Sequence, residues 1–117
     1  MKIWFNRVND SHRSILEVQD RDEDGELVDV EVTIGRDPEN MLVLESPLVS
    51  RNHALIRRVS DHFEFENVGL NACLVGDRDV GVGETVRFES GSQIRIWPFT
   101  LSLEMESVTR ITRKDLD

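Results

Sequence analysis

Apolar and polar residues alternate along most of the chain, with the period of two that places successive side chains on opposite faces of a β-strand. The clearest run covers residues 27–34, and the runs 54–59 and 62–66 predict two paired strands joined by a turn at residues 60–61. The side chains of the first run that are predicted to face the core are Val28, Val30, Val32 and Ile34. Further short strands are predicted at residues 14–18, 41–44, 72–75, 85–88, 93–97 and 99–105.

No stretch of the sequence shows the 3.6-residue apolar period of an amphipathic helix. About ten short strands separated by glycine, proline, asparagine and aspartate turn signals are typical of a two-sheet β-sandwich or a small barrel. The length of 117 residues fits one domain, which is large enough to bury a core without metals or disulfides. The fold class is therefore predicted to be all-β.

Net charge and cysteine content limit the classes of partner and the cellular compartment that we expect. The formal net charge of −9 argues against nucleic acid or an anionic membrane as the general partner, because both require a basic surface. The single cysteine, Cys73, cannot form an internal disulfide, which favours a reducing compartment and a cytoplasmic location. The first residues lack the apolar run of a signal peptide, and no stretch is long enough to span a bilayer.

Three predicted loops carry groups that can hold an anion or a peptide backbone. Arg36 follows a glycine directly after the run 27–34, and its guanidinium offers a planar fork of donors suited to phosphate oxygens. Ser50 and Arg51 lie in the turn before the strand 54–59, where a hydroxyl and backbone amides can add further donors. Asn71 has a side-chain amide that can both donate to and accept from a peptide backbone.

Three stretches of the sequence resemble the forkhead-associated (FHA) domain, a family of phosphothreonine-binding β-sandwiches. They are Ile34-Gly35-Arg36-Asp37-Pro38-Glu39-Asn40, Val49-Ser50-Arg51-Asn52-His53-Ala54 and Asn67-Val68-Gly69-Leu70-Asn71. The turn and strand at residues 91–96 also match, so the resemblance covers residues 14–105. It implies a two-sheet β-sandwich of about eleven short strands that binds phosphopeptides through loops at one end. Residues 1–13 are interpreted as an N-terminal extension or an extra strand, and residues 106–117 as a polar tail or linker.

The resemblance also implies roles for single residues. Arg36 and Ser50 are expected to hold the phosphate, Arg51 to add charge or a backbone contact, and Asn71 to fix the peptide backbone beside the phosphothreonine. Gly35 and His53 are expected to support the site structurally. The implied function is a binding module without catalytic activity, metal or cofactor. Its partner would be a phosphothreonine-containing protein, and the domain would belong to a larger multidomain protein.

The chain departs from the family pattern around Asn71. The family usually has threonine before this asparagine and glycine–threonine after it, whereas this chain has Leu70, Ala72 and Cys73, and the preceding segment is one residue short. A hydroxyl that faces the phosphate is therefore missing, and a neutral hydrogen bond contributes about 0.5–1.5 kcal/mol. The alternative is a degenerate FHA domain that acts as a phospho-independent protein–protein or self-association module.

A calcium loop is a further hypothesis for the acidic segment before residue 27. Asp20, Asp22, Asp24, Gly25 and Glu31 fit the spacing of the twelve-residue loop of an EF-hand. An EF-hand needs a helix on each side, whereas the period-two run 27–34 predicts a strand. The interpretation preferred for this segment is an acidic turn without metal.

Ser50 and His53 also raise the hypothesis of a nucleophile and its base. The two residues are three positions apart on one turn, and no carboxylate that would orient the histidine and no oxyanion motif accompanies them. We therefore expect the histidine to brace the turn.

Overall fold

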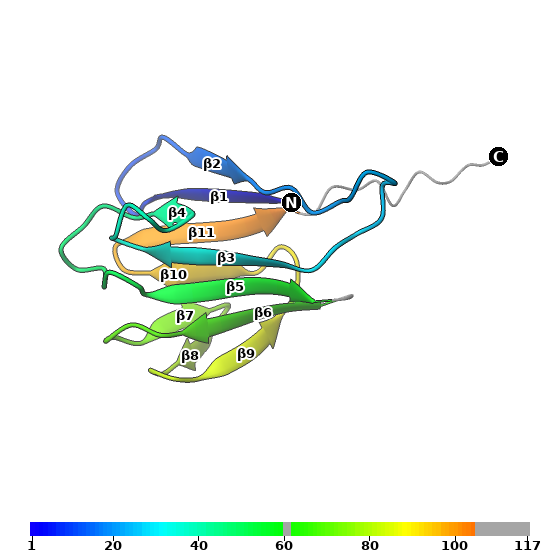
Figure 1. Ribbon diagram of the computed structural model, residues 1–117. Coiled ribbons are helices and arrows are strands. Elements are labelled where there is room, and N and C mark those ends of the chain that lie inside the picture. The colour runs from blue at the N-terminus through cyan, green and yellow to red at the C-terminus, as the bar shows by residue number, and fades with distance from the viewer. Residues whose placement is uncertain (60–61, 105–117) are drawn as a thin grey trace.

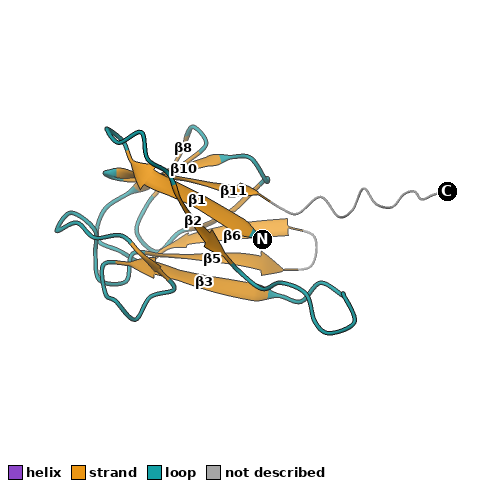
Figure 2. Cartoon of the chain, turned by 90° about the horizontal axis from the view of Figure 1, so that it is seen from above, coloured by secondary structure: helices purple, strands orange, loops and turns teal. Residues whose placement is uncertain are grey.

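The structure is a computed structural model that describes residues 1–59 and 62–104. Within these residues the chain forms eleven strands and no helix, and the strands make two sheets that pack face to face (Figures 1 and 2). The prediction of an all-β sandwich is confirmed. The predicted turn at residues 60–61 and the predicted tail at residues 106–117 lie outside the described residues.

The larger sheet has six strands in the order β2-β1-β11-β10-β7-β8. All of its strand pairs whose register is defined are antiparallel. Its strands are β1 (Lys2–Arg7), β2 (Ser14–Glu17), β7 (Cys73–Val75), β8 (Arg78–Val80), β10 (Gln93–Ile96) and β11 (Phe99–Glu104).

The smaller sheet has five strands in the order β4-β3-β5-β6-β9. The short edge strand β4 runs parallel to β3, and the other pairs are antiparallel. Its strands are β3 (Val30–Gly35), β4 (Leu42–Val43), β5 (Ala54–Val59), β6 (His62–Asn67) and β9 (Thr85–Phe88). The turn between β9 and β10 carries the chain from one sheet to the other.

The core lies between the two sheets. Along β5 and β6 every second residue is buried, which is the burial pattern that the alternating sequence predicts. Both sheets contribute fully buried aliphatic and aromatic side chains. They include Ile3, Val32, Ile34, Ile56, Phe65, Ile94, Ile96 and Leu101.

Several strands are shorter than predicted, and in two of them a residue that was predicted to be buried is exposed. Val28 was predicted to face the core, but it is exposed and β3 begins only at Val30. The reason is that the backbone N–H of Val28 donates to the carbonyl of Asp20, and Leu27 pairs with Arg21, so this segment belongs to the acidic loop instead. Met41 was predicted in a buried strand and is also exposed, because β4 comprises only Leu42–Val43.

Two further strands of the larger sheet, β1 and β8, are not among the strands predicted from the alternating pattern. β1 lies within the N-terminal residues 1–13 and is paired on both sides, with β2 and with β11. Strand β8 was not predicted. Only Val80 of its three residues is buried, and a single apolar residue cannot reveal an alternating pattern.

The loops that follow β3 and β6, the loop that precedes β5 and the turn between β10 and β11 gather at one end of the sandwich, on the left of Figure 1. The loop between β2 and β3 and the C-terminal end of β11 lie at the opposite end. Residues 1–59 and 62–104 contain no helix of the length and apolarity needed to cross a membrane.

Candidate functional site

Hydrogen bonds hold the loop after β3 against the loop before β5. The backbone N–H of Arg36 donates to the carbonyl of Ser50 (3.0 Å), and the N–H of Asp37 donates to the carbonyl of Arg51 (3.2 Å). The side chain of Asn40 donates to the same Arg51 carbonyl through Nδ2 (2.7 Å). The predicted site residues Arg36, Ser50 and Arg51 are therefore brought together by their own backbones.

Gly35 makes this close approach of the loops feasible. A Cβ atom at this position would lie 2.0 Å from the carbonyl oxygen of Arg51 and 2.8 Å from Nδ2 of Asn40. Both distances are well inside van der Waals contact, so any side chain would force the two loops apart. The glycine before Arg36 is thus required by its surroundings.

His53 joins the second loop to the third from a buried position. Its Nδ1 accepts a hydrogen bond from the backbone N–H of Ser50 (3.0 Å), and its carbonyl accepts one from Val68 (2.9 Å). Burial lowers the pKa of the imidazole below its ordinary value. Gly69 packs on the ring, since a Cβ there would lie 3.0 Å from Cγ and Cδ2 of His53.

The hydroxyl of Ser50 also connects two loops. Its Oγ accepts a hydrogen bond from the backbone N–H of Leu70 (3.2 Å). Because Oγ acts as an acceptor in this contact, the hydroxyl hydrogen remains available for a further acceptor. Nδ1 of His53 receives the backbone of Ser50, so it is not positioned as a base for the hydroxyl.

Arg36 points one end of its guanidinium at the protein and leaves the other end to solvent. Its Nε donates to the carbonyl of Val49 (3.0 Å), which orients the planar group. Within residues 1–59 and 62–104 no acceptor is recorded for its two terminal nitrogens, and the residue is exposed. Those nitrogens carry four N–H donors in the fork geometry that matches phosphate oxygens.

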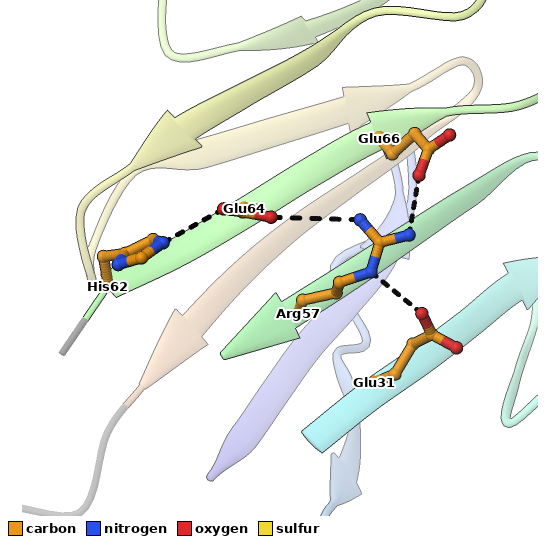
Figure 3. A network of polar contacts seen from close by, with 5 residues as sticks. All are labelled: Glu31, Arg57, His62, Glu64 and Glu66. Atoms are coloured by element: carbon orange, nitrogen blue, oxygen red, sulfur yellow. Dashed lines mark hydrogen bonds and ion pairs between the residues drawn. The ribbon is translucent and has the colours of Figure 1, made fainter. Parts of the chain in front are cut away.

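Arg57 shows the opposite arrangement. Its Nε donates to Glu31 (2.9 Å) and its Nη2 to Glu66 (2.7 Å), while Nη1 lies 3.9 Å from Glu64, which in turn contacts His62 (Figure 3). These pairs raise the pKa of Arg57, with the hydrogen bond to Glu66 as the main cause. All five residues lie on β3, β5 and β6. This cluster is a cross-strand network that stabilises the sheet, and its arginine is already neutralised.

Arg51 and Asn71 both lie at the surface beside this site. Arg51 is exposed, and its carbonyl accepts the hydrogen bonds from the N–H of Asp37 and from Nδ2 of Asn40. Asn71 is held through its backbone carbonyl, which accepts a hydrogen bond from Nδ2 of Asn67 (2.9 Å).

Asn67 is a site-forming residue that the sequence analysis did not single out. It is fully buried, and its Nδ2 donates to the carbonyls of Asn71 and Val80 at 2.9 Å each. Its Oδ1 accepts from the N–H of Gly69 at 3.0 Å. An asparagine two residues before a glycine at the end of a strand is an Asx-turn signal, which would have identified it.

The departures from the family pattern have different environments. Leu70 is 83% exposed and Ala72 is also exposed, although residue 72 was predicted to begin a strand. Cys73 begins β7 and is buried, which raises the pKa of its thiol to about 12. The first two therefore present apolar groups at the surface, and the third packs in the core.

The acidic segment forms a turn that uses its own carboxylates. Oδ1 of Asp22 accepts from the backbone N–H groups of Asp24 and Glu26, both at 2.9 Å, and Gly25 has a φ of 83°. Glu31, on β3, forms an ion pair with Arg57 of β5 (2.9 Å). Within residues 1–59 and 62–104 no cluster of three or more histidine, cysteine, aspartate or glutamate side chains is arranged to hold a metal ion.

A sequence model of the FHA domain matches residues 32–97, which is more than half of the chain. A search of curated protein sequences found no match to this chain. Similar solved structures include EmbR of Mycobacterium tuberculosis in complex with a low-affinity phosphopeptide, with 20% identity and a TM-score of 0.62. That match covers 90% of this chain and 26% of EmbR, so this chain spans about a quarter of that protein.

Two further structures are isolated FHA domains. The FHA domain of FhaA, solved with the intracellular domain of a second protein, has 17% identity and a TM-score of 0.63, and the match covers 86% of this chain and 97% of that one. The FHA domain of MEK1, solved with a HOP1 peptide phosphorylated on threonine, has 14% identity and a TM-score of 0.63. This match covers 88% of this chain and 97% of that domain. At these identities the likeness concerns the fold.

Proposed function

The chain belongs to the FHA domain family, and from this premise we propose that it is a phosphothreonine-dependent protein-binding module. It recruits phosphorylated partner proteins through the loops after β3, before β5 and after β6 (Figure 1). It works by binding alone and catalyses no reaction. Neighbouring structures of the fold that were solved with phosphopeptides support this proposal.

The proposal rests on the hydrogen-bond donors that Arg36 and Ser50 keep available. Each side chain is anchored by one contact, to Val49 and to Leu70, and each keeps N–H or O–H donors that this contact does not use. The Arg36 fork and the Ser50 hydroxyl together offer up to five N–H and O–H donors to one anion. Fixed donors of this kind lose little conformational entropy when a ligand binds, because the protein has already ordered them.

The remaining site residues complete the proposed binding mode. Arg51 adds positive charge beside the anion, and Asn71 is placed at the end of a hydrogen-bonded loop where its amide can pair with a peptide backbone. Gly35, His53 and Asn67 hold the loops in position. The multidomain context, the cytoplasmic location and the domain boundaries at residues 14 and 105 stay predictions.

A second function is favoured by the exposed apolar residues near the site. Leu70 is 83% exposed, and the two threonines that the family usually has on this loop are replaced by Leu70 and Cys73. A domain with this surface can dock a partner without phosphate. The two functions differ in a single measurable property, the dependence of binding on the phosphoryl group.

Isothermal titration calorimetry separates the two functions. Peptides are first selected from a degenerate library with a fixed phosphothreonine, and the best of them is then titrated together with its unphosphorylated twin. The proposal predicts binding of the phosphorylated peptide and no measurable heat for the twin or for calcium alone. Equal affinity for the two peptides would establish the phospho-independent function instead.

A further inference from the structure

A hollow of about 460 Å³ lies beside Arg36, on the side where the chain leaves β4. It is lined by Arg36 and by the consecutive residues Glu45, Ser46 and Pro47. These three residues lie between β4 and β5, so the hollow is bounded by the end of β3 and by the loop after β4 (Figure 1). One cationic and one anionic side chain therefore border the same hollow.

Backbone contacts hold Glu45 next to the strand end that carries Arg36. The N–H of Leu44 donates a 2.9 Å hydrogen bond to the carbonyl of Gly35, so Glu45 follows directly after a contact with the residue before Arg36. The carbonyl of Glu45 accepts a hydrogen bond from Nη2 of Arg7, on β1. The backbone of Glu45 is thus fixed from two directions, which places its side chain at the hollow.

Hydrogen bonds also order the rest of the loop after β4. Ser46 is buried, and its carbonyl accepts a hydrogen bond from the N–H of Val49 (3.0 Å). The carbonyl of the same Val49 accepts from Nε of Arg36 (3.0 Å), so one peptide segment positions both walls of the hollow. Pro47 adds a backbone angle that its ring restricts. The hollow is therefore formed before any ligand arrives.

The two charged walls keep their charges available. Glu45 is exposed, and within residues 1–59 and 62–104 its carboxylate has no recorded ion pair or hydrogen bond. It forms no ion pair with Arg36 across the hollow, and Arg36 keeps its terminal N–H donors. The site thus offers a donor fork for an anion and, beside it, a carboxylate for a cation.

We infer that this hollow receives a lysine or arginine side chain of the phosphorylated peptide and that Glu45 selects for it. The inference rests on the proposed phosphopeptide function and names the class of peptide that the site binds. The aliphatic stem of the basic side chain would pack on the ring of Pro47, and its charged end would reach the carboxylate of Glu45. The partners would be substrates of a kinase that prefers basic residues near its target threonine.

Glu45 discriminates by repulsion as well as by attraction. A phosphate held by Arg36 carries about −1.5 to −2 charge and lies near the Glu45 carboxylate. A peptide without a cation brings these negative groups together uncompensated, whereas a basic side chain on the same peptide offsets the repulsion. Arg36 repels that basic side chain until the phosphate neutralises the guanidinium. Binding therefore requires both charges on one peptide.

The test uses peptides that differ only in the proposed occupant. In a phosphothreonine peptide, lysine, glutamine and glutamate are placed in turn at each position from three before to four after the phosphothreonine, and calorimetry in about 50 mM salt gives the affinities. At one position lysine should bind about 2- to 5-fold more tightly than glutamine, and glutamate more weakly than glutamine. Salt of about 0.5 M should reduce the preference. The unphosphorylated lysine peptide should give no measurable heat.

Variants of the chain assign the preference to one carboxylate. Glu45→Gln should bind the lysine and glutamine peptides equally, and Glu45→Lys should prefer glutamate over lysine at the same position. Glu89→Lys is the matched control, because Glu89 is exposed and follows β9, which runs antiparallel to β6 and therefore ends away from the loop after β6. It makes the same change in net charge and should keep the preference of the unmodified chain. Urea unfolding should be unchanged in all three variants, since both glutamates are exposed.

Three results would overturn the inference. Phosphate-dependent binding without a preference for lysine at any position leaves the proposed function intact and removes the hollow from it. A preference that Glu89→Lys reduces as much as Glu45→Lys does is an effect of net charge and not of this site. Equal binding of the lysine peptide with and without its phosphate defeats the proposed function together with the inference.

Discussion

The backbone N–H of Ser50 donates a 3.0 Å hydrogen bond to Nδ1 of His53, so the ring must carry its proton on Nε2. The ring is buried, and burial lowers its pKa from the ordinary value of 6.5. If Nδ1 were protonated, its N–H would face the backbone N–H of Ser50, and the hydrogen bond that holds this turn would be lost. The integrity of this loop is therefore linked to pH.

We expect the domain to lose stability as the pH falls below about 6.5 because of His53. The folded-state pKa is depressed, so the unfolded chain binds the proton first and the free energy of unfolding decreases with falling pH. The decrease reaches at most about 1.4 kcal/mol per pH unit and ends at the folded-state pKa. Urea unfolding at intervals between pH 5 and 8 measures it.

The histidine responsible is identified by substitution. His53→Gln should unfold at lower urea concentration and show a flatter pH dependence than the unmodified chain. His12→Gln is the matched control, because the side chain of His12 is 95% exposed. If the pH dependence is the same in His53→Gln and in the unmodified chain, carboxylates and not this histidine cause it.

Gly35→Ala should destabilise the fold by about 3 kcal/mol or more. The added methyl would lie 2.0 Å from the carbonyl oxygen of Arg51 and would separate the loops of Arg36 and Ser50. Gly81→Ala is the matched control, since its Cβ would meet only the flexible Glu84 side chain at 3.4 Å. Equal unfolding free energies for the two variants would show that the loops can separate at little cost.

Asn67→Ala should cost about 2–4 kcal/mol, because it leaves the carbonyls of Asn71 and Val80 and the N–H of Gly69 without their partner. Asn6→Ala, at a partly exposed position with two hydrogen bonds to backbone carbonyls, should cost less than about 1 kcal/mol. Faster hydrogen exchange at Gly69 and Leu70 in Asn67→Ala would report the loosened loop. Unchanged exchange there would assign the loop's order to other contacts.

Much of the fold could be predicted from the sequence where a strand has one buried face and one exposed face. Residues 62–66 alternate strictly and residues 54–59 alternate less regularly, and the structure has β6 and β5 at these positions, with β6 one residue longer. The segment around Val28 shows the same alternation, yet its backbone pairs with the acidic loop. Periodicity describes which side chains can share a face, whereas the pairing partner depends on contacts between distant parts of the chain.

The candidate site also contains residues that the sequence identified and residues that only the structure shows. Spacing along the sequence identified the loops that carry Arg36, Ser50 and Asn71. It did not identify Asn67, whose importance comes from three hydrogen bonds made inside the fold. Residues that act through long-range contacts become visible only when the topology is known.

The proposed phosphate clamp depends on Arg36, which gives the most direct test of the site. Arg36→Ala removes the fork that would meet the phosphate and should weaken phosphopeptide binding by about 2–5 kcal/mol if the pair is desolvated in the complex. Arg36→Lys keeps the charge but loses the planar fork and the hydrogen bond from Nε to Val49. Its affinity for the phosphopeptide should therefore lie between that of the unmodified chain and that of Arg36→Ala. Folding stability should change little in both variants, since Arg36 is exposed.

Arg78→Ala provides the charge-matched control for this experiment. Arg78 is an exposed residue paired with Val75 at the end of the β7–β8 hairpin that lies away from Ala72, so its loss changes the net charge without touching the three loops. Calorimetry should therefore give the unmodified affinity for Arg78→Ala and the large loss for Arg36→Ala. If both variants lose affinity equally, the effect is one of net charge, and if neither does, the phosphate binds at another part of the surface.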